Sequence, residues 1–307
     1  MERFKCLTSK YLSKLGVSEQ TLNEEQKYNL KENGYILIHK TDEEWLKLGI
    51  DIELISNVVD ELIEKETWRG GRESHDYLTN KLKNGEHPEP GAQRLNHLLN
   101  KHECFRNLFT IPETLAAARY LIDSREEIAL SQIILRMPLP GQGEQNWHVD
   151  WIPRRKESEP VRSVLSSLLL DNYTKENGTT RIVPGSHKKL CSPDEEGYFD
   201  QDHPDQVYIE APRGTLLIYD INTWHRGGKN INGKKRRHIN INYRSRKIWQ
   251  QVNFKKILPH DIKKDMSDAE LFLLKARKED KSRNEFLFKY RNHPFIKSIC
   301  KIYWKYL

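Results

Sequence analysis

Three residues in the middle of the chain have the types and the spacing of a metal site. His148 and Asp150 flank Val149, and His225 follows the apolar segment 216–219. Side chains two residues apart on a strand point to the same face, so the imidazole and the carboxylate would lie side by side there. A second imidazole from a later strand would complete the set. We therefore predict that His148, Asp150 and His225 bind a metal ion.

The spacing of His148 and Asp150 is a weak signal when taken alone. It recurs at His203 and Asp205, where Pro204 lies between them and argues against an interior strand. We assign that second pair to a surface turn. Two imidazoles and one carboxylate leave three coordination positions open, which is how non-haem iron(II) oxygenases hold a 2-oxo acid and O2.

Short strands are expected on both sides of these residues. Segments rich in β-branched and aromatic residues, separated by Gly, Pro and Asn, predict strands at 128–137, 161–170, 179–183, 206–209, 215–219 and 236–243. Many short strands with such turns are typical of an antiparallel sandwich or jelly roll. We expect a single domain, mainly β with flanking α-helices.

The first third of the chain predicts helices. Asn23 and Gln26 form a capping-box pattern, and Gly34 is expected to end that helix in the left-handed conformation, before a strand at 35–38. Apolar spacing predicts further helices near 54–62 and 115–122, and residues 84–94 predict a long loop. We divide the chain into a helical part (1–127), a β core (128–246) and a basic helical extension (247–307).

The positive charge is confined to that extension. The chain has 51 Lys and Arg against 44 Asp and Glu; residues 247–307 hold 15 and 7 of these, so residues 1–246 have 36 and 37. A nearly neutral body argues against nucleic acid as a partner. In the extension, the apolar stripe from Phe295 to Tyr303 predicts a helix that packs on the core or on a partner subunit, and a membrane-surface helix is the alternative.

The cysteines and the N-terminal residues indicate in which cellular compartment the protein is expected. The four cysteines are far apart, which argues against disulfides and a thiolate zinc site, and no run approaches the roughly 18 apolar residues of a membrane span. Residues 1–15 predict an amphipathic helix, with an organelle transit peptide as the alternative. We expect a cytoplasmic protein.

Several segments resemble the phytanoyl-CoA dioxygenase family, in the family's order, from about residue 22 to 246. They are 22–26 (LNEEQ) running into 32–36 (ENGYI), 177–188 (NGTTRIVPGSHK), and 214–218 (GTLLI) leading to 224–228 (WHRGG). The resemblance implies a double-stranded β-helix (a cupin-like jelly roll) that binds Fe(II) and 2-oxoglutarate and uses O2, with ascorbate supporting activity. It places His148, Asp150 and His225 on the iron ligands.

The resemblance also implies an arginine for the far carboxylate of 2-oxoglutarate. The family places it eleven residues after the distal histidine, at Arg236, while the adjacent Arg237 would face the other way. Arg236 shares its face with His238 and Asn240, which favours it, but periodicity alone leaves both open. Gln132 and Thr180 are further candidates for contact with 2-oxoglutarate, with structural roles as the alternative.

Substrate contacts are predicted around the metal site. The candidates are Arg94, Asn96, Trp151, Arg154 and Arg162, and the loop 84–94 is a candidate lid. Parity puts Trp147 and Trp151 on the Val149 face, which favours core packing for both, with contact to the substrate as the alternative for Trp151. The arginines favour a small substrate that carries a carboxylate.

The implied reaction is the oxidation of an unactivated C–H bond with release of succinate and CO2, as hydroxylation, desaturation or cyclisation in natural-product biosynthesis. The carboxylate of Asp150 argues against halogenation, because halogenating relatives have Gly or Ala there. The alternatives are an acyl-CoA 2-hydroxylase, a zinc hydrolase, and a non-catalytic jelly-roll binding module. Oxidative demethylation of nucleic acid is disfavoured by the neutral body.

We expect a monomer or a homodimer.

Overall fold

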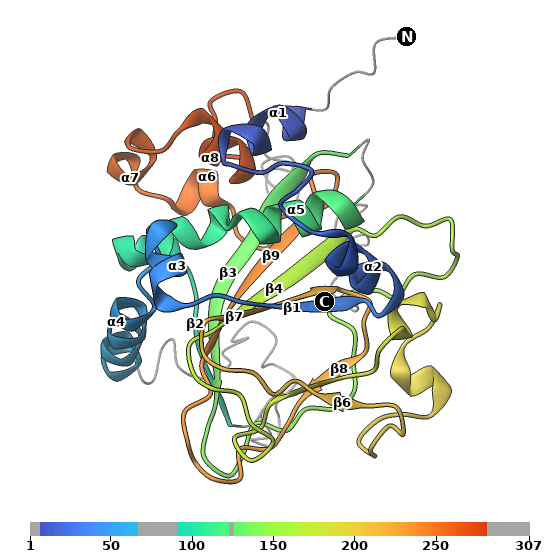
Figure 1. The fold of residues 1–307 in the computed structure, drawn as a ribbon. Helices are drawn as coiled ribbons and strands as arrows, with labels where there is room; N and C mark the ends of the chain where they lie inside the picture. Colours follow the sequence, from blue (N-terminus) through green and yellow to red (C-terminus); the bar gives the residue numbers. More distant parts are fainter. Residues whose placement is uncertain (1–6, 67–90, 123–125, 281–307) are drawn as a thin grey trace, which may run out of the picture.

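The computed structural model describes residues 7–66, 91–122 and 126–280. Within them the backbone forms two antiparallel sheets, with helices gathered on one side (Figure 1). The strands are β1 (Tyr35–His39), β2 (Ala92–Leu95), β3 (Ile128–Pro138), β4 (Ser163–Leu169), β5 (Thr180–Ile182), β6 (Val207–Tyr208), β7 (Thr215–Asp220), β8 (His225–Gly227) and β9 (His238–Ser245). The helices are α1 (Leu7–Lys14), α2 (Glu24–Glu32), α3 (Asp42–Lys47), α4 (Ile52–Lys65), α5 (Pro112–Leu121), α6 (Phe254–Ile257), α7 (His260–Lys264) and α8 (Asp268–Leu273), with 3-10 turns at Leu98–Asn100, Glu103–Thr110, Ser186–Lys188 and Pro193–Glu196.

The two sheets form a jelly roll. The larger sheet has the strand order β1-β7-β4-β9-β3-β2, and the smaller one has the order β6-β5-β8. Leu165 and Leu217 of the larger sheet pack against Ile182 of the smaller one, so the two sheets share a core. The predicted fold, a jelly roll with flanking helices, is confirmed.

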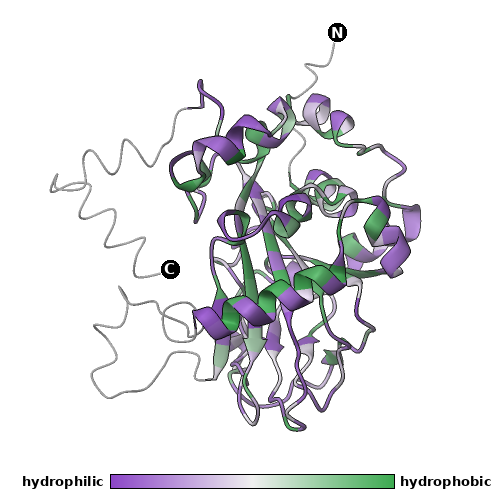
Figure 2. Cartoon of the chain, turned by 90° about the vertical axis from the view of Figure 1, so that its left-hand side faces the viewer, coloured by the Kyte–Doolittle hydropathy of each residue, from purple (hydrophilic) through white to green (hydrophobic). Residues whose placement is uncertain are grey.

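Helices cover the outer face of the larger sheet. Ile239 and Ile241 of β9 are buried in one core with Leu115 of α5, which lies across the strands in Figure 1. Figure 2 shows hydrophilic and hydrophobic residues side by side along the same helices, as expected for helices with one buried face. This packing fixes which face of β9 is left for the interior between the sheets.

The inner face of the larger sheet is divided into an apolar half and a polar half. On β4 and β7 it carries Leu165, Leu169, Leu217 and Tyr219, which belong to the core between the sheets. On β2, β3 and β9 the register and the alternation of side chains give a mainly polar set, in which Ile134 is apolar: Arg94, Gln132, Ile134, Arg136, His238, Asn240, Asn242 and Arg244. Buried polar side chains need partners, so we expect this half to line a ligand site.

Local signals set the ends of α2 as predicted. The Gln26 N–H donates to Asn23 Oδ1 (2.8 Å) and the Asn23 N–H donates to Gln26 Oε1 (2.9 Å), which completes the capping box. The chain leaves the helix at Gly34, whose φ is +82°, and a Cβ there would lie 2.5 Å from His187 Nδ1. Both the left-handed conformation and the close approach of His187 require glycine at this position.

Strand β2 corrects one prediction. The loop expected at 84–94 gives way at Ala92 to a strand that pairs with β3, with Arg94 opposite Arg136. The segment lacks β-branched residues, so its sequence gave no strand signal, and the partner strand supplies the pairing. Residues 84–90, with the candidate lid, lie outside the described residues.

The basic extension is described as far as residue 280. Helix α8 contacts α1, and the rings of Tyr11 and Phe272 stack with centroids 4.5 Å apart. The stripe from Phe295 to Tyr303 lies outside the described residues. In the described ranges, none of the helices combines the length and the apolar character that a membrane crossing needs.

The packing of β9 against the helices makes a stability prediction. Ile241→Ala should lower the free energy of unfolding by about 2–5 kcal/mol, because it opens a cavity in a fully buried part of the core. Leu37→Ala on β1, where the side chain is 40% exposed, is the control and should cost less than half as much. Urea unfolding measures both, and equal losses would contradict the assignment of the helix-covered core.

Candidate metal centre

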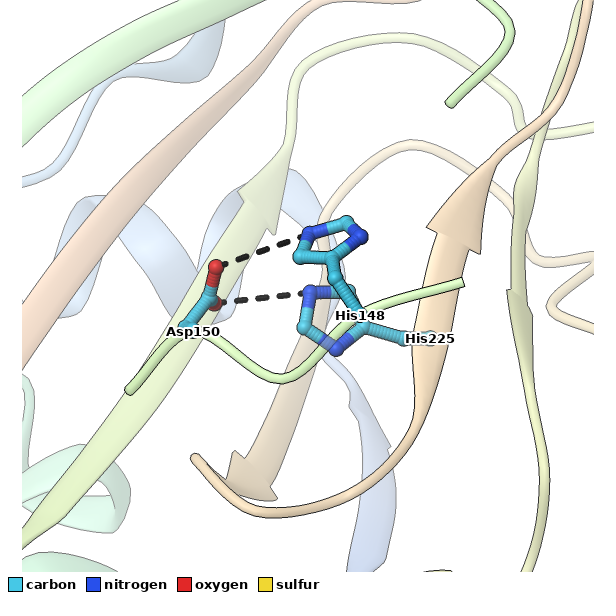
Figure 3. Close-up of side chains that lie close together, drawn as sticks. All are labelled: His148, Asp150 and His225. Carbon is cyan, nitrogen blue, oxygen red and sulfur yellow. Dashed lines mark ion pairs between the residues drawn. The ribbon is translucent and has the colours of Figure 1, made fainter. Parts of the chain in front are cut away.

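His148, Asp150 and His225 lie together at one end of the space between the sheets. Their ligand atoms are all within 4.8 Å of one another. Nε2 of His148 is 3.7 Å from Asp150 Oδ1, and Nε2 of His225 is 3.4 Å from Asp150 Oδ2. Figure 3 shows both imidazoles side by side and facing the carboxylate. Two imidazole nitrogens and a carboxylate oxygen are a donor set that suits a divalent transition metal.

Backbone contacts fix which ring nitrogen each histidine presents. Nδ1 of His148 is 2.8 Å from the Asn146 carbonyl, and Nδ1 of His225 is 2.9 Å from the Thr223 carbonyl. A carbonyl only accepts, so each Nδ1 carries the proton and each Nε2 lone pair faces the site. This is the arrangement that metal-bound histidines have, with the second nitrogen held by a backbone carbonyl.

The two histidines are paired through the backbone. His148 and His225 form an isolated antiparallel bridge, in which each N–H donates to the other's carbonyl at 3.1 Å. The expected strand through Asp150 is not regular: after this bridge the chain bends, and the Asp150 N–H donates to the Ile221 carbonyl. The carboxylate is therefore placed by a loop contact in addition to the strand alternation that the sequence suggested.

The turn before His225 is held by α2 and its cap. The Thr223 hydroxyl donates to the Gly34 carbonyl (3.1 Å), and the Trp224 N–H donates to Ser186 Oγ (2.8 Å). The Asp220 N–H also donates to the Gly34 carbonyl. The end of α2 and the segment 183–186 thus position the third candidate ligand.

Asp150 is charged in this setting. Burial alone would raise its pKa, but in the metal-free site the protonated forms of His225 and His148, in which Nε2 also carries a proton, and the Tyr219 hydroxyl outweigh burial and lower it. A metal at the site would take the place of the Nε2 protons. The Tyr219 hydroxyl donates to Asp150 Oδ2 at 3.3 Å and lies 3.5 Å from His225 Nε2. Burial and the charge of Asp150 raise the pKa of Tyr219 well above its usual range, so it acts as a neutral donor that orients the carboxylate.

Arg236 and Arg237 have different surroundings. The Arg237 guanidinium binds Asp171 (2.7 Å) and Asp60 (2.9 Å), and so ties α4 to the end of β4. Arg236 is fully buried and donates to the Tyr173 hydroxyl at 3.2 Å. Its Nε and Nη2 have no hydrogen-bond partner in the part of the chain that the structure describes. An orphaned, buried guanidinium fits an anion bound beside it.

Other cationic side chains surround Arg236. Arg136 of β3 is buried and lies against Gly227, where a Cβ would come within 3.3 Å of its Nη1. His238 is opposite Arg136 in the sheet, and burial together with Arg236, Arg136 and Arg94 lowers its pKa well below its usual range. His238 is therefore neutral, and the positive charge of this wall belongs to the arginines.

The other cosubstrate candidates also face this space. Gln132 lies opposite Asn242 on the polar half of the inner face. Thr180 pairs with Gly227 and shares the inner face of β5 with Ile182. Their contact with 2-oxoglutarate stays a prediction.

The substrate candidates separate into three groups. Trp151 and Arg94 lie near Asp150. The Arg244 guanidinium stacks on the Trp151 ring, 4.4 Å from its centroid. Burial lowers the pKa of Arg94, and the negative charge of Asp150 opposes that shift. Arg154 donates to the His187 and Glu159 carbonyls and so holds a loop. Asn96 and Arg162 are exposed.

Two further histidines, His187 and His203, do not belong to the candidate metal site. His187 is held at the end of α2, with Nε2 3.0 Å from the Lys31 carbonyl. His203 is in a turn, as predicted, but it is not on the surface: it is 4% exposed and packs against Tyr198 and Trp147, because aromatic rings enclose it. Trp147 is also buried there, in agreement with core packing.

Sequence analysis missed Tyr219, Arg136 and Arg244. Arg136 is four residues after Gln132, inside the strand predicted at 128–137, and Arg244 is two after Asn242, one step beyond the strand predicted at 236–243. Strand alternation would have placed both on the inner face. Tyr219 occupied an apolar run, where nothing distinguishes a hydroxyl aimed at a carboxylate from core packing.

Comparisons with known proteins identify a family and related proteins. A family model described as phytanoyl-CoA dioxygenase matches residues 31–239. An uncharacterised protein of Mycobacterium tuberculosis is 27% identical over 175 residues, which are 55% of this chain and 61% of that protein. The chain thus spans about three fifths of the length of this curated relative.

Solved structures share the fold. The carbocyclase SnoK from nogalamycin biosynthesis, described as non-haem and α-ketoglutarate-dependent, superposes with a TM-score of 0.53 at 17% identity, covering 74% of this chain and 85% of SnoK. HygX from Streptomyces hygroscopicus, with nickel and 2-oxoglutarate bound, gives a TM-score of 0.52 at 14% identity, covering 75% of this chain and 89% of HygX.

The contact of Tyr219 with Asp150 makes a prediction about metal affinity. Tyr219→Phe should weaken Co(II) binding by about tenfold, because groups that orient a metal ligand typically contribute 10- to 100-fold to metal affinity. Isothermal titration of the metal-free protein measures this effect. Tyr35→Phe, opposite Tyr219 on β1, is the matched control. Equal Co(II) affinities in the two variants would show that Tyr219 does not orient the carboxylate.

Proposed function

The chain belongs to the phytanoyl-CoA dioxygenase family, and on this basis we propose that it is an Fe(II)- and 2-oxoglutarate-dependent oxygenase. One observation carries the proposal. Two Nε2 atoms and a carboxylate converge at one point, and the fully buried Arg236, on the same inner wall, has two orphaned nitrogens. The first feature suits a metal, and the second suits the far carboxylate of a dicarboxylic cosubstrate.

His148, Asp150 and His225 would hold the iron. Both imidazoles are set in the tautomer that binds metal, and the side chains of His148 and Asp150 are 32% and 29% exposed, so the site is open on one side. When bound, iron and 2-oxoglutarate supply the oxidising chemistry, in which O2 is reduced and 2-oxoglutarate is converted to succinate and CO2. The protein's own part is to position these groups and to limit access of water.

Arg236 would hold 2-oxoglutarate, with Gln132 and Thr180 as further contacts. A guanidinium pairs with a carboxylate through two parallel hydrogen bonds, which fixes the orientation of the ligand. The hydrogen bond from Arg236 to Tyr173 leaves Nε and Nη2 for this purpose. A zinc hydrolase or a silent binding module would have no use for a buried, orphaned arginine at this place, which supports the oxygenase over both.

The reaction is the oxidation of an unactivated C–H bond of a small metabolite. Asp150 occupies the position that halogenating relatives leave open, which supports hydroxylation, desaturation or cyclisation. The similarity to SnoK, a carbocyclase from nogalamycin biosynthesis, supports a role in natural-product biosynthesis. The arginines near the triad support a carboxylate-bearing substrate, and an acyl-CoA 2-hydroxylase is the alternative.

The remaining proposals concern the whole protein. We propose a cytoplasmic monomer or homodimer that does not bind nucleic acid, with a helical part (1–127), a catalytic core (128–246) and a basic extension (247–307). The contacts of α8 with β3 of the core and with α1 support an extension that packs on the core; contact of the extension with a membrane surface is the alternative.

The proposed activity is tested by the consumption of 2-oxoglutarate. The protein with Fe(II), ascorbate and O2 should form succinate slowly without substrate and faster with the right one, and His225→Ala should abolish both. Succinate is measured by chromatography. If the protein binds zinc tightly and forms no succinate with Fe(II) and any candidate substrate, it is not an oxygenase.

Substitution of Arg236 should weaken 2-oxoglutarate binding, whereas substitution of the neighbouring Arg237 should lower the stability of the fold. Arg236→Met should weaken 2-oxoglutarate binding to the Ni(II)-loaded protein by roughly 30- to 150-fold, since hydrogen bonds to a charged group are worth about 2–3 kcal/mol. Arg237→Met should instead lower the free energy of unfolding by about 2 kcal/mol, because it leaves Asp171 without its partner, and should leave 2-oxoglutarate affinity unchanged. The reverse pattern would assign the cosubstrate to Arg237.

A further inference from the structure

An arginine lies at each end of the polar wall formed by the inner face of β9 and the residues before it. Arg236 precedes the strand, and Arg244 lies near its other end, opposite Ser163 of β4. The candidate metal site lies between them: Tyr219, which contacts Asp150, is opposite Leu165, and Leu165 is opposite Asn242. The Asp150 N–H donates to the Ile221 carbonyl, and the Ile221 N–H donates to the Ser163 carbonyl. Arg244 is therefore the neighbour of the site on the side away from Arg236.

Arg244 is buried without an acidic partner. It is 4% exposed, its Nε donates to Asn242 Oδ1 (2.9 Å), and its Nη1 donates to the Trp249 carbonyl (3.3 Å). Among the residues that the structure describes, no carboxylate lies within ion-pair distance (4.0 Å) of its guanidinium. All its hydrogen bonds thus go to neutral oxygens, which orient the group without neutralising it.

An aromatic ring holds the guanidinium in place. Arg244 lies 4.4 Å above the ring of Trp151, the residue after Asp150. Stacking fixes the plane of a guanidinium and leaves its edge free for hydrogen bonds to a carboxylate or a phosphate. Such a pre-oriented arginine loses less conformational entropy on binding an anion than a flexible one.

The charge of this region is unbalanced once a metal is bound. Burial lowers the pKa of Arg244 to about 10, and the negative charge of Asp150 opposes that shift. Asp150 is thus the acidic residue whose charge acts on Arg244. A divalent ion held by Asp150 would reverse the sign of that neighbour, because the ion and the carboxylate together carry a net charge of +1 beside the buried guanidinium. A second anion close to Arg244 would restore the balance.

We propose that Arg244, stacked on Trp151, binds an oxyanion of the substrate, so that the substrate is a small carboxylate- or phosphate-bearing molecule. This inference rests on the proposed function, in which Arg236 holds 2-oxoglutarate. The two anions then bind on opposite sides of the metal, and one arginine cannot serve both. Arg94 adds a second positive charge near Asp150, whereas Arg154 is engaged with two carbonyls and Arg162 is exposed. The substrate anion therefore binds at Arg244 of β9, in place of Arg154 or Arg162.

The test is anion binding to the full chain loaded with Ni(II) and saturated with 2-oxoglutarate, so that Arg236 is occupied. Sodium acetate and inorganic phosphate are titrated separately by calorimetry in a buffer free of other small oxyanions. The wild type should bind at least one of them at one saturable site. Acetate preference would indicate a carboxylate substrate, and phosphate preference a phosphorylated one.

Arg244→Gln, which keeps an amide donor, should weaken this binding at least tenfold, and Arg244→Lys by three- to tenfold, because an ammonium cannot bind in the fork geometry. Arg213→Met is the matched control: this arginine pairs with Asp42 and Glu53 before β7, and its loss should leave anion affinity unchanged. If thermal denaturation shows that the Gln variant does not fold, the Lys variant decides.

Two results would overturn the inference: no anion binding by the 2-oxoglutarate complex of the wild type, or wild-type affinity in the folded Arg244 variants. Failure of the proposed function looks different, because the Ni(II)-loaded protein would then not bind 2-oxoglutarate in the first titration.

Discussion

The reciprocal backbone hydrogen bonds between His148 and His225 are the contact on which the site depends. Directly paired residues of an antiparallel bridge point to the same face, so this one bridge sets two imidazoles side by side, with ring centroids 4.3 Å apart. Asp150 reaches the same point because its N–H is bound to Ile221, in the turn that leads from β7 to β8. Gly34 and Ser186 hold that turn from the other side. A distortion of any of these backbone contacts would separate the three donor atoms.

The large sheet serves two purposes with its two faces. Its outer face is mostly apolar and packs against helices, with Ser166 hydrogen-bonded to Thr114 of α5 within the contact, and this packing provides the burial that stabilises the fold. Its inner face is apolar only where the sheets pack on each other, and polar on β2, β3 and β9. Burying arginines in that half costs free energy unless anions neutralise them. The structure therefore holds a concentration of positive charge whose favourable state is the one with anionic ligands bound, which is how a jelly roll can combine a stable frame with an affinity for small acids.

Much of this could be predicted from the sequence, and the limits have physical reasons. Strand alternation placed His148 and Asp150 on one face, and the capping box and Gly34 defined the end of α2, since these signals are local. The role of Arg237 depends on contacts distant in the sequence: only the fold brings Asp60 and Asp171 to it, while Arg236 has no ion pair among the described residues. Strand β2 was missed because its pairing comes from β3, and the burial of His203 because its aromatic neighbours come from distant segments. Arg244 had a local signal, its parity with Asn242, but its stacking on Trp151 depends on the bend after His148.

The central claim is that one metal ion and one dicarboxylate bind at defined atoms of this wall. A crystal structure of the protein grown without oxygen in the presence of Fe(II) and 2-oxoglutarate tests it most directly. The account predicts iron bound to Nε2 of His148, Nε2 of His225 and the Asp150 carboxylate, with the far carboxylate of 2-oxoglutarate on Arg236. Iron bound at other residues, or a far carboxylate bound to another arginine with Arg236 still orphaned, would contradict it.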